Sequence, residues 1–174
     1  MRLKSSTFIN FADVEHLKQS FEPLADNDAR ILILGSIPGD RSIELGEYYG
    51  HPQNRFWKMI AVITGAPPPI NYGQKRAMLM QNRIALWDVA QRAHRQGSMD
   101  SAIRNEEPND IAAFIAGQKK LQRVVFNGKK AEQLYGRYIE RLSGICYLSM
   151  PSTSPANAAV SFDILCEKWR EILI

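Results

Sequence analysis

Four short apolar segments, separated by segments with a helical pattern, most constrain how this chain folds. They span residues 30–35, 83–87, 122–126 and 145–148. Each is too short for a helix, and the first is rich in β-branched residues, so they are predicted to be buried strands. Strands that alternate with helices predict an α/β fold in which helices cover both faces of a parallel sheet.

Helix signals fill the intervals between these strands. The first helix is expected to end at Gly65, a suitable C-cap, and Asn109 is the expected N-cap of a later one. The last helix carries apolar residues at helical spacing. Helices are expected over residues 54–65, 71–82, 107–118, 128–142 and 158–173.

The length and composition suit a single domain, residues 1–174, of which 45% are hydrophobic. No apolar run is long enough for a transmembrane helix, and the N-terminal segment MRLKSSTFINFADVEH lacks the apolar region of a signal peptide. We therefore expect a cytoplasmic protein without a membrane partner. The net charge of +4 fits a polyanionic partner, although the basic residues are spread along the chain.

The cysteines and the common motifs indicate neither a metal nor a bound nucleotide cofactor. Cys146 lies in a strand-like run and Cys166 in a helix-like one, where single cysteines are usually small core residues. The motifs G-x-G-x-x-G, G-x-x-x-x-G-K-[ST], G-x-S-x-G and H-E-x-x-H are absent. A metal-free protein is expected, and a mononucleotide-binding enzyme is disfavoured.

Polar clusters follow all four predicted strands. They are residues 35–42, bracketed by glycines and called the glycine loop below, then Asp88, the pair Asn127–Gly128, and residues 150–158, MPSTSPANA. The carboxyl ends of parallel strands meet at one edge of a sheet, where such folds bind ligands. We therefore expect a site at this edge, although a tight connection alone would also explain the glycine loop.

Residues 151–157, called the hydroxyl loop below, place three hydroxyl side chains between two prolines. Their hydroxyls and backbone N–H groups suit an anion such as a DNA phosphate. Ser154 as N-cap, with Pro155 at the first helical position, would start a helix. A capped turn without a ligand explains this local sequence equally well.

Residues 47–57, EYYGHPQNRFW, form an aromatic segment before a helix. Such a segment can stack on a flat ring and hydrogen-bond to its edge. The structural alternative places Phe56 and Trp57 in the core, makes His51 a loop residue with local partners, and makes Asn54 a helix cap.

The motifs ILGSIPGDRS, YYGHPQNRFW, VFNGKKA and PSTSPANA, in this order, resemble the hypoxanthine-DNA glycosylase branch of the uracil-DNA glycosylase superfamily. HPQNRFWK also resembles the mismatch-specific uracil glycosylases, and the resemblance runs from about residue 21 to the last helix. It implies a three-layer α/β/α sandwich around a four-stranded parallel sheet. It also implies a monomeric DNA repair enzyme, without a cofactor, that flips deoxyinosine out of DNA and hydrolyses its N-glycosidic bond, leaving an abasic site. The implied partner is DNA containing deaminated bases: inosine, and also uracil or xanthine.

The resemblance implies roles for individual residues as well. Tyr49 matches the aromatic residue that stacks on the flipped base, the glycine loop matches the water-positioning motif, and the hydroxyl loop matches the segment that grips phosphates and wedges into the duplex. The expected base-binding residues are Gly35, Ser36, Ile37, Pro38, Gly39, Tyr49 and Asn127. The expected DNA-binding residues are Pro151, Ser152, Thr153, Ser154, Pro155 and Asn157.

Ile37 departs from the mismatch-specific branch, which has a catalytic Asn at this position. Its side chain can neither orient nor deprotonate water, and the hypoxanthine branch is known for lacking that polar residue. Asn54 is our candidate for positioning the water, with His51 and Asp88 as alternative catalytic residues. Asp88 would act as a general base, read the base, or cap a turn. Asn127 would read the base edge or cap the following helix, and we prefer the cap.

No lysine lies in the motifs expected to line the pocket, so the resemblance implies a monofunctional enzyme without a Schiff base. Two alternatives stay open. One is a uracil- or mismatch-specific glycosylase of the same superfamily, because specificity can depend on one hydrogen bond. The other is a non-catalytic DNA-binding module that senses damage, for which Ile37 is the best support.

Overall fold

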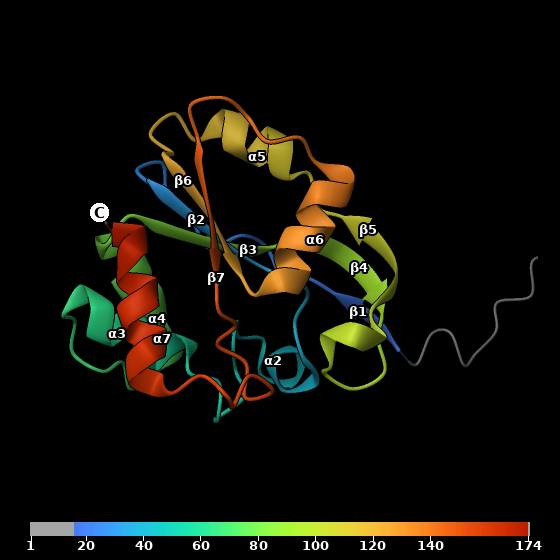
Figure 1. Cartoon of the computed structure of the whole chain (residues 1–174), viewed down its shortest axis with the longest axis horizontal. Helices are drawn as coiled ribbons and strands as arrows, with labels where there is room; N and C mark the ends of the chain where they lie inside the picture. Colours follow the sequence, from blue (N-terminus) through green and yellow to red (C-terminus); the bar gives the residue numbers. More distant parts are fainter. Residues whose placement is uncertain (1–15, 174) are drawn as a thin grey trace, which may run out of the picture.

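The computed structural model describes residues 16–173, and its centre is a four-stranded parallel sheet in the order β3-β2-β6-β7 (Figure 1). The strands are β2 (Ile31–Gly35), β3 (Ile84–Asp88), β6 (Arg123–Asn127) and β7 (Cys146–Met150). All four predicted strands are present, displaced by one or two residues at most. The predicted α/β sandwich with a four-stranded parallel sheet is confirmed.

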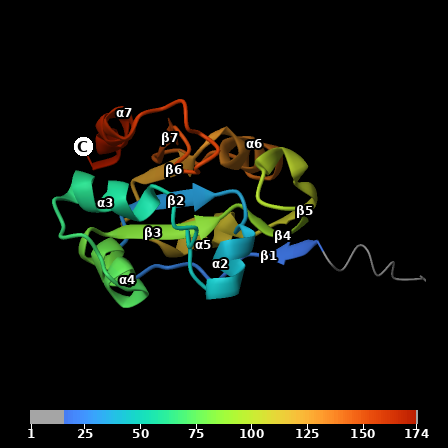
Figure 2. The ribbon, with the colours of Figure 1, turned by 90° about the horizontal axis from the view of Figure 1, so that it is seen from below.

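Helices cover both faces of this sheet. They are α3 (Phe56–Thr64), α4 (Tyr72–Gln81), α5 (Ile111–Gly117), α6 (Lys129–Tyr138) and α7 (Phe162–Trp169), which continues into η2 (Arg170–Leu173). Ile31 and Ile33 of β2 enter the hydrophobic cluster under α3, α4 and α7, whereas Leu32 and Leu34 enter the one under α5 and α6. This two-residue period is that of a strand buried on both faces. Figures 1 and 2 show α3 and α7 side by side on the first face.

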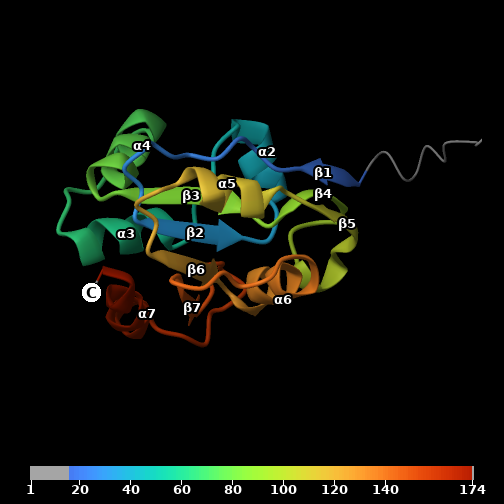
Figure 3. The ribbon, with the colours of Figure 1, turned by 90° about the horizontal axis from the view of Figure 1, so that it is seen from above.

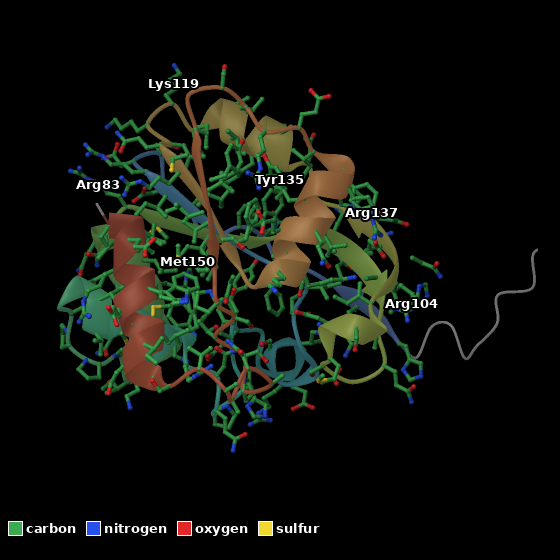
Figure 4. The ribbon with its side chains drawn as sticks, in the orientation of Figure 1. Arg83, Arg104, Lys119, Tyr135, Arg137 and Met150 are labelled. Carbon is green, nitrogen blue, oxygen red and sulfur yellow. The ribbon has the colours of Figure 1, made fainter. Side chains whose placement is uncertain are left out.

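Aromatic pairs hold α5 and α6 on the second face. Phe114 of α5 packs against Trp87 of β3, with 5.4 Å between ring centroids, and Tyr135 of α6 packs against Phe126 of β6 at 5.1 Å. Figure 3 shows α5 over the sheet, and Figure 4 shows Tyr135 between α6 and the strands. Such pairs are worth about 1 kcal/mol beyond the area that they bury. They fix α6 so that it starts at the carboxyl edge of the sheet.

A second sheet, which the sequence patterns did not predict, lies beside the first. It is antiparallel, in the order β1-β4-β5, with strands β1 (Leu17–Gln19), β4 (Ala90–His94) and β5 (Arg104–Pro108). The strand sequences LKQ, AQRAH and RNEEP are mostly polar because much of their surface is exposed. No apolar run therefore signals them, and only pairing between distant residues, such as Leu17 with His94, creates the sheet.

The expected N-cap of α5 is wrong. Asp110 caps this helix, since its side chain accepts a hydrogen bond from the N–H of the third residue beyond it at 3.0 Å. Asn109 is instead buried, and its side-chain amide donates to the backbone carbonyl of Asp88 at 2.8 Å. The side chain of Asn109 thus bonds to a residue distant in the sequence instead of capping the helix next to it.

The last helix begins later than expected. Its N-cap is Ser161, which accepts a hydrogen bond from the N–H of Ile164. Ser154 Oγ accepts from the Ala156 N–H at 3.2 Å, but the residues that follow form only turns, so no helix starts at Ser154 and Pro155.

The two cysteines lie in different environments. Cys166 is buried, as expected, whereas Cys146 is exposed because β7 is an edge strand with a partly uncovered surface. Over residues 16–173, no three His, Cys, Asp or Glu side chains gather as a metal site would require. Over the same residues, no helix combines the length and the apolar character needed to span a bilayer.

The strand order creates a crevice at one edge of the parallel sheet. The chain passes from β2 outward to β3 and then returns to β6 on the other side of β2. Loops that leave neighbouring strands diverge at such a point, where open α/β sheets bind ligands. The neighbouring strands β2 and β6 end at Gly35 and Asn127, respectively. The glycine loop and the start of α6 therefore border the crevice.

Candidate active site at the carboxyl edge of the sheet

One cavity of about 1080 Å³ opens at this edge. The glycine loop with α2 (Asp40–Leu45), the aromatic segment and the hydroxyl loop surround it, and Figure 1 shows these segments together below the strands. Every residue predicted for the site lines the cavity: Gly35, Ser36, Ile37, Pro38, Gly39, Tyr49, His51, Asn54, Asp88, Asn127, Pro151, Ser152, Thr153, Ser154, Pro155 and Asn157. Their location at one cavity is thus established, whereas their individual roles stay predictions.

The glycine at the end of β2 is required by its neighbours. A Cβ at Gly35 would overlap Asp88 Oδ1 and lie 3.1 Å from Tyr49 Oη. Ile37 is 5% exposed and packs in the hydrophobic cluster under α5 and α6. The part of the glycine loop from Asp40 onward is the first turn of α2. Ile37 therefore anchors the loop to the core while it also lines the cavity.

Asp88 is the buried acid of the cavity, with 4% of its surface exposed. Its Oδ2 lies 3.2 Å from Ser20 Oγ, which donates to it, and its Oδ1 lies beside Gly35. Burial raises the pKa of Asp88 to about 7, while Ser20 and Arg95 act in the opposite direction. A carboxyl group with a pKa near neutrality can accept or deliver a proton, as a general base or acid must.

Tyr49 is held in an unusual backbone conformation. Its φ of 53° lies in the left-handed region, which costs a residue other than glycine roughly 1 kcal/mol. One face of its ring stacks on Phe56, with centroids 4.1 Å apart. The neighbouring Tyr48 is anchored on both sides: its hydroxyl donates to Phe21 O at 3.2 Å, and its carbonyl accepts from Trp57 Nε1 at 2.8 Å.

The hydroxyl of Tyr49 is buried and has no hydrogen-bond partner among residues 16–173. Burial raises its pKa, so the group is a protonated donor at neutral pH. A buried donor without a partner costs free energy. A ligand atom or a water molecule beside Gly35 and Asp88 would satisfy it.

Asn54 and His51 both have local partners. Asn54 Oδ1 accepts a hydrogen bond from the Phe56 N–H at 3.0 Å, in the first turn of α3. An amide oxygen accepts two hydrogen bonds and the amide nitrogen donates two more, so this contact leaves capacity for a substrate. His51 is exposed, and its Nδ1 accepts from the Gln53 N–H at 3.2 Å. His51 thus satisfies the structural alternative, a loop residue with a local partner.

Asn127 clamps the hydroxyl loop to β6. Its Nδ2 donates to Thr153 Oγ1 at 3.0 Å, and its Oδ1 accepts from the Thr153 N–H at 2.9 Å. The preferred role of Asn127 as a helix cap is wrong, because Gly128 is the N-cap of α6 and no side chain caps it. Thr153 is fully buried. Its hydroxyl therefore serves the clamp and is not presented to a phosphate.

Arg55, which the sequence analysis missed, holds the hydroxyl loop from the other side. Its guanidinium donates to the backbone carbonyls of Asn157, at 2.9 Å, and Val160, and its backbone N–H donates to Thr153 O at 3.1 Å. Asn157 Nδ2 closes the loop onto Ser152 O at 2.9 Å. Because these carbonyls accept from side chains and from the Arg55 N–H, they do not form the backbone hydrogen bonds of a helix, and no helix begins here. Nothing in the local sequence distinguishes Arg55 from a surface arginine.

Charged residues of the small sheet hold the glycine loop. The side chain of Arg95, just after β4, is 2% exposed; it donates to the Pro38 carbonyl and lies 3.6 Å from Asp100. Asp100 in turn accepts from Ser36 Oγ at 2.7 Å. Lys18 of β1 is buried and pairs with the acid that begins α2. Buried charges need partners, so these contacts fix where the glycine loop lies.

Two lysines also line the cavity: Lys129 at the start of α6 and Lys168 of α7. The expectation that no lysine lines the pocket is therefore wrong. Both residues are exposed. Exposed ammonium groups at the mouth of a cavity suit the phosphates of a bound nucleic acid.

The comparisons with known proteins agree with this geometry. The family model of the uracil DNA glycosylase superfamily matches residues 22–172. The chain is 44% identical over 143 residues to a hypoxanthine DNA glycosylase of Methanosarcina barkeri, covering 80% of this chain and 88% of that protein. It is 40% identical over 148 residues to a hypoxanthine DNA glycosylase of Methanosarcina acetivorans, covering 83% and 91%.

A solved structure gives the same result at the level of the fold. The solution NMR structure of a candidate uracil DNA glycosylase from Methanosarcina acetivorans superposes with a TM-score of 0.74. It shares 36% sequence identity and covers 90% of this chain and 98% of that one. With the cavity at the predicted edge and the family model matching most of its length, this chain belongs to the uracil DNA glycosylase superfamily.

Proposed function

We propose that this chain is a monofunctional DNA glycosylase that hydrolyses the N-glycosidic bond of deoxyinosine in DNA, releases hypoxanthine and leaves an abasic site. The observation that carries the proposal is that a buried acid, an aromatic ring and the hydroxyl loop line one cavity. The names of the two Methanosarcina relatives support hypoxanthine as the base.

The flipped base would stack on Tyr49. One face of this ring packs on Phe56, so the base would take the other face. Because the Tyr49 hydroxyl lies beside Gly35 and Asp88, it would bond to the attacking water and not to a base stacked over the ring. Extruding inosine costs less than extruding a fully paired base, since its pairing is weaker.

Hydrolysis builds positive charge on the sugar and negative charge on the departing base. Ionised Asp88 would take a proton from the attacking water and would also stabilise the charged sugar. Asn54 would orient the same water through the part of its amide that α3 does not use. Water adds to the sugar carbon as its bond to the base nitrogen breaks, and the leaving hypoxanthine takes up a proton.

The hydroxyl loop would grip the DNA backbone. Ser152 Oγ and Ser154 Oγ each accept a backbone N–H of the loop at 3.2 Å, which leaves their hydroxyl protons free to donate. Phosphate oxygens accept such bonds, and they fix a protein on DNA without reading its sequence. Lys129 and Lys168 would add charge at the same mouth.

The test is a cleavage assay with the purified protein in the presence of EDTA. Separate duplexes carry one deoxyinosine, deoxyuridine or deoxyxanthosine, and hot alkali reveals abasic sites. The protein is expected to remove the base from the inosine strand, which should then break only on alkali treatment. The rate of an Asn54→Ala variant is expected to fall on the order of a hundredfold. Gln53→Ala, at an exposed neighbouring position, is the control and should keep the wild-type rate.

Other outcomes would change the proposal. Cleavage only at uracil would move the chain to the activity for which the solved Methanosarcina structure is named. Lesion binding without any abasic product would make it a damage sensor. Strand breaks before alkali treatment would show β-elimination and contradict a monofunctional enzyme.

A further inference from the structure

We propose that Met99 inserts into the duplex and fills the space that the flipped base vacates, an inference that rests on the proposed function. Met99 lines the mouth of the cavity and is 57% exposed. Of the large apolar side chains exposed among residues 16–173, it alone lines this cavity. An exposed apolar side chain at the mouth of a DNA-binding cavity is well placed to leave water for the interior of a base stack.

The backbone on both sides of Met99 is tied to the glycine loop. Ser98 Oγ accepts from the Asp40 N–H at 3.3 Å, and Asp100 accepts from Ser36 Oγ at 2.7 Å. The buried Arg95, four residues before Met99, donates to the Pro38 carbonyl of the same loop. The position of Met99 is thus fixed relative to the cavity, while its side chain stays free.

The hydroxyl loop, which also lines the cavity, offers no comparable side chain. Its exposed residue is Ala156, which carries one methyl group, and Pro155 is only partly exposed. Thr153 is fully buried in the clamp with Asn127. The loop that the resemblance assigns to wedging can therefore grip phosphates but fills little of the space left by a purine. Methionine is long, unbranched and adaptable, which suits a gap of that size.

Insertion predicts a difference between duplex and single-stranded substrates, because only a duplex has a stack to refill. We expect Met99→Ala to lower kcat/KM on duplex deoxyinosine by roughly tenfold and to leave single-stranded deoxyinosine unchanged. Met99→Leu, which restores apolar volume, should recover most of the duplex rate. Ile70→Ala is the matched control, since Ile70 is 84% exposed and does not line the cavity. It should change neither rate.

A second measurement reads insertion without cleavage. A 2-aminopurine beside the lesion should brighten when the wild-type protein unstacks it, and the increase should be lost in Met99→Ala but not in Ile70→Ala. Equal duplex rates for wild type and Met99→Ala, or an equal loss on both substrates, would overturn the insertion. A Met99-dependent fluorescence change without inosine cleavage would instead overturn the proposed function and leave the insertion standing.

Discussion

The two sides of the cavity are held by different kinds of contact. On one side, Arg55 and Asn127 hold the hydroxyl loop by bonding to backbone groups and to one hydroxyl. On the other side, Arg95 and Lys18 hold the glycine loop through buried charges: Arg95 pairs with Asp100 and Lys18 pairs with Asp40. Hydrogen bonds to backbone groups fix the conformation of a loop. Buried charges do this as well, and they also shift the pKa of a neighbouring acid.

We expect the charged side of the cavity to affect the chemical step and the other side to affect DNA binding. Arg95 lowers the pKa of Asp88 and Asp100 raises it, so the charged side acts on the acid at the centre of the cavity. Within residues 16–173, the Arg55 guanidinium hydrogen-bonds only to the hydroxyl loop and the segment after it. Damage to the charged side should therefore change kcat and its pH dependence, and damage to the other side should change KM.

The largest effect is expected from Asp88→Asn. Loss of a general base typically lowers a rate by about 100- to 10,000-fold, and kcat for inosine cleavage should fall within that range. The control is Asp28→Asn, because Asp28 is an exposed acid paired with Lys120. A normal kcat in Asp88→Asn would exclude Asp88 as the base and leave Asn54 as the candidate.

The pH dependence of the wild-type protein tests the same residue. Burial raises the pKa of Asp88 from its ordinary 3.8 to about 7, so the folded chain keeps a proton that the unfolded chain releases. Its contribution to stability is full below about pH 4 and is lost as the pH rises to about 7. Activity runs the opposite way, because the base must be ionised: kcat should rise with pH and level off above about 7. A profile without this inflection would contradict the assignment.

Arg95→Met should give the next largest effect, on stability and chemistry together. Removing one member of a buried charged group costs about 3 kcal/mol, which urea unfolding will measure. The inflection of kcat should also move to higher pH, because Arg95 lowers the pKa of Asp88. Arg92→Met, at an exposed position of β4 three residues before Arg95, is the control. An unchanged inflection would show that the charged side only supports the fold.

Arg55→Met should act mainly on KM. The variant frees the carbonyls that hold the hydroxyl loop, at a cost of about 2 kcal/mol in stability. A several-fold rise in KM for duplex DNA is expected, with kcat nearly unchanged. Lys58→Met, which removes an exposed charge on α3 that lies 4.6 Å from the centroid of the Phe162 ring, is the control for the loss of a positive charge. A fall in kcat at constant KM would break the proposed division between the two sides.

Thr153→Val should give the smallest effect. The change keeps the shape of the side chain but leaves the Asn127 amide without its hydroxyl partner, which costs about 1 kcal/mol. Thr153→Ser retains the hydroxyl and should restore the unfolding midpoint. If both variants unfold alike, the hydroxyl contributes nothing measurable to the clamp.

Much of the fold was predictable because its signals are local. An apolar run such as residues 31–34 is buried on both faces of the sheet whatever its neighbours are, so its composition alone indicates a strand. The small sheet had no such signal, since β4 and β5 are largely polar and form through pairing with each other. The helix starts at Asn109 and Ser154 failed because a distant partner engages each segment.

The location of the site was also determined by the sequence. Residues that follow parallel strands meet at one edge by geometry, so Gly35, Asp88 and Asn127 had to lie near one another. Only the tertiary structure decided what each polar group bonds to. Asn127 could cap a helix or clamp a loop, and Arg55 could face solvent or hold carbonyls, because the choice depends on contacts between residues far apart in the chain. The periodicity of apolar residues can be seen in the sequence itself, whereas a long-range hydrogen bond forms only when distant segments pack together.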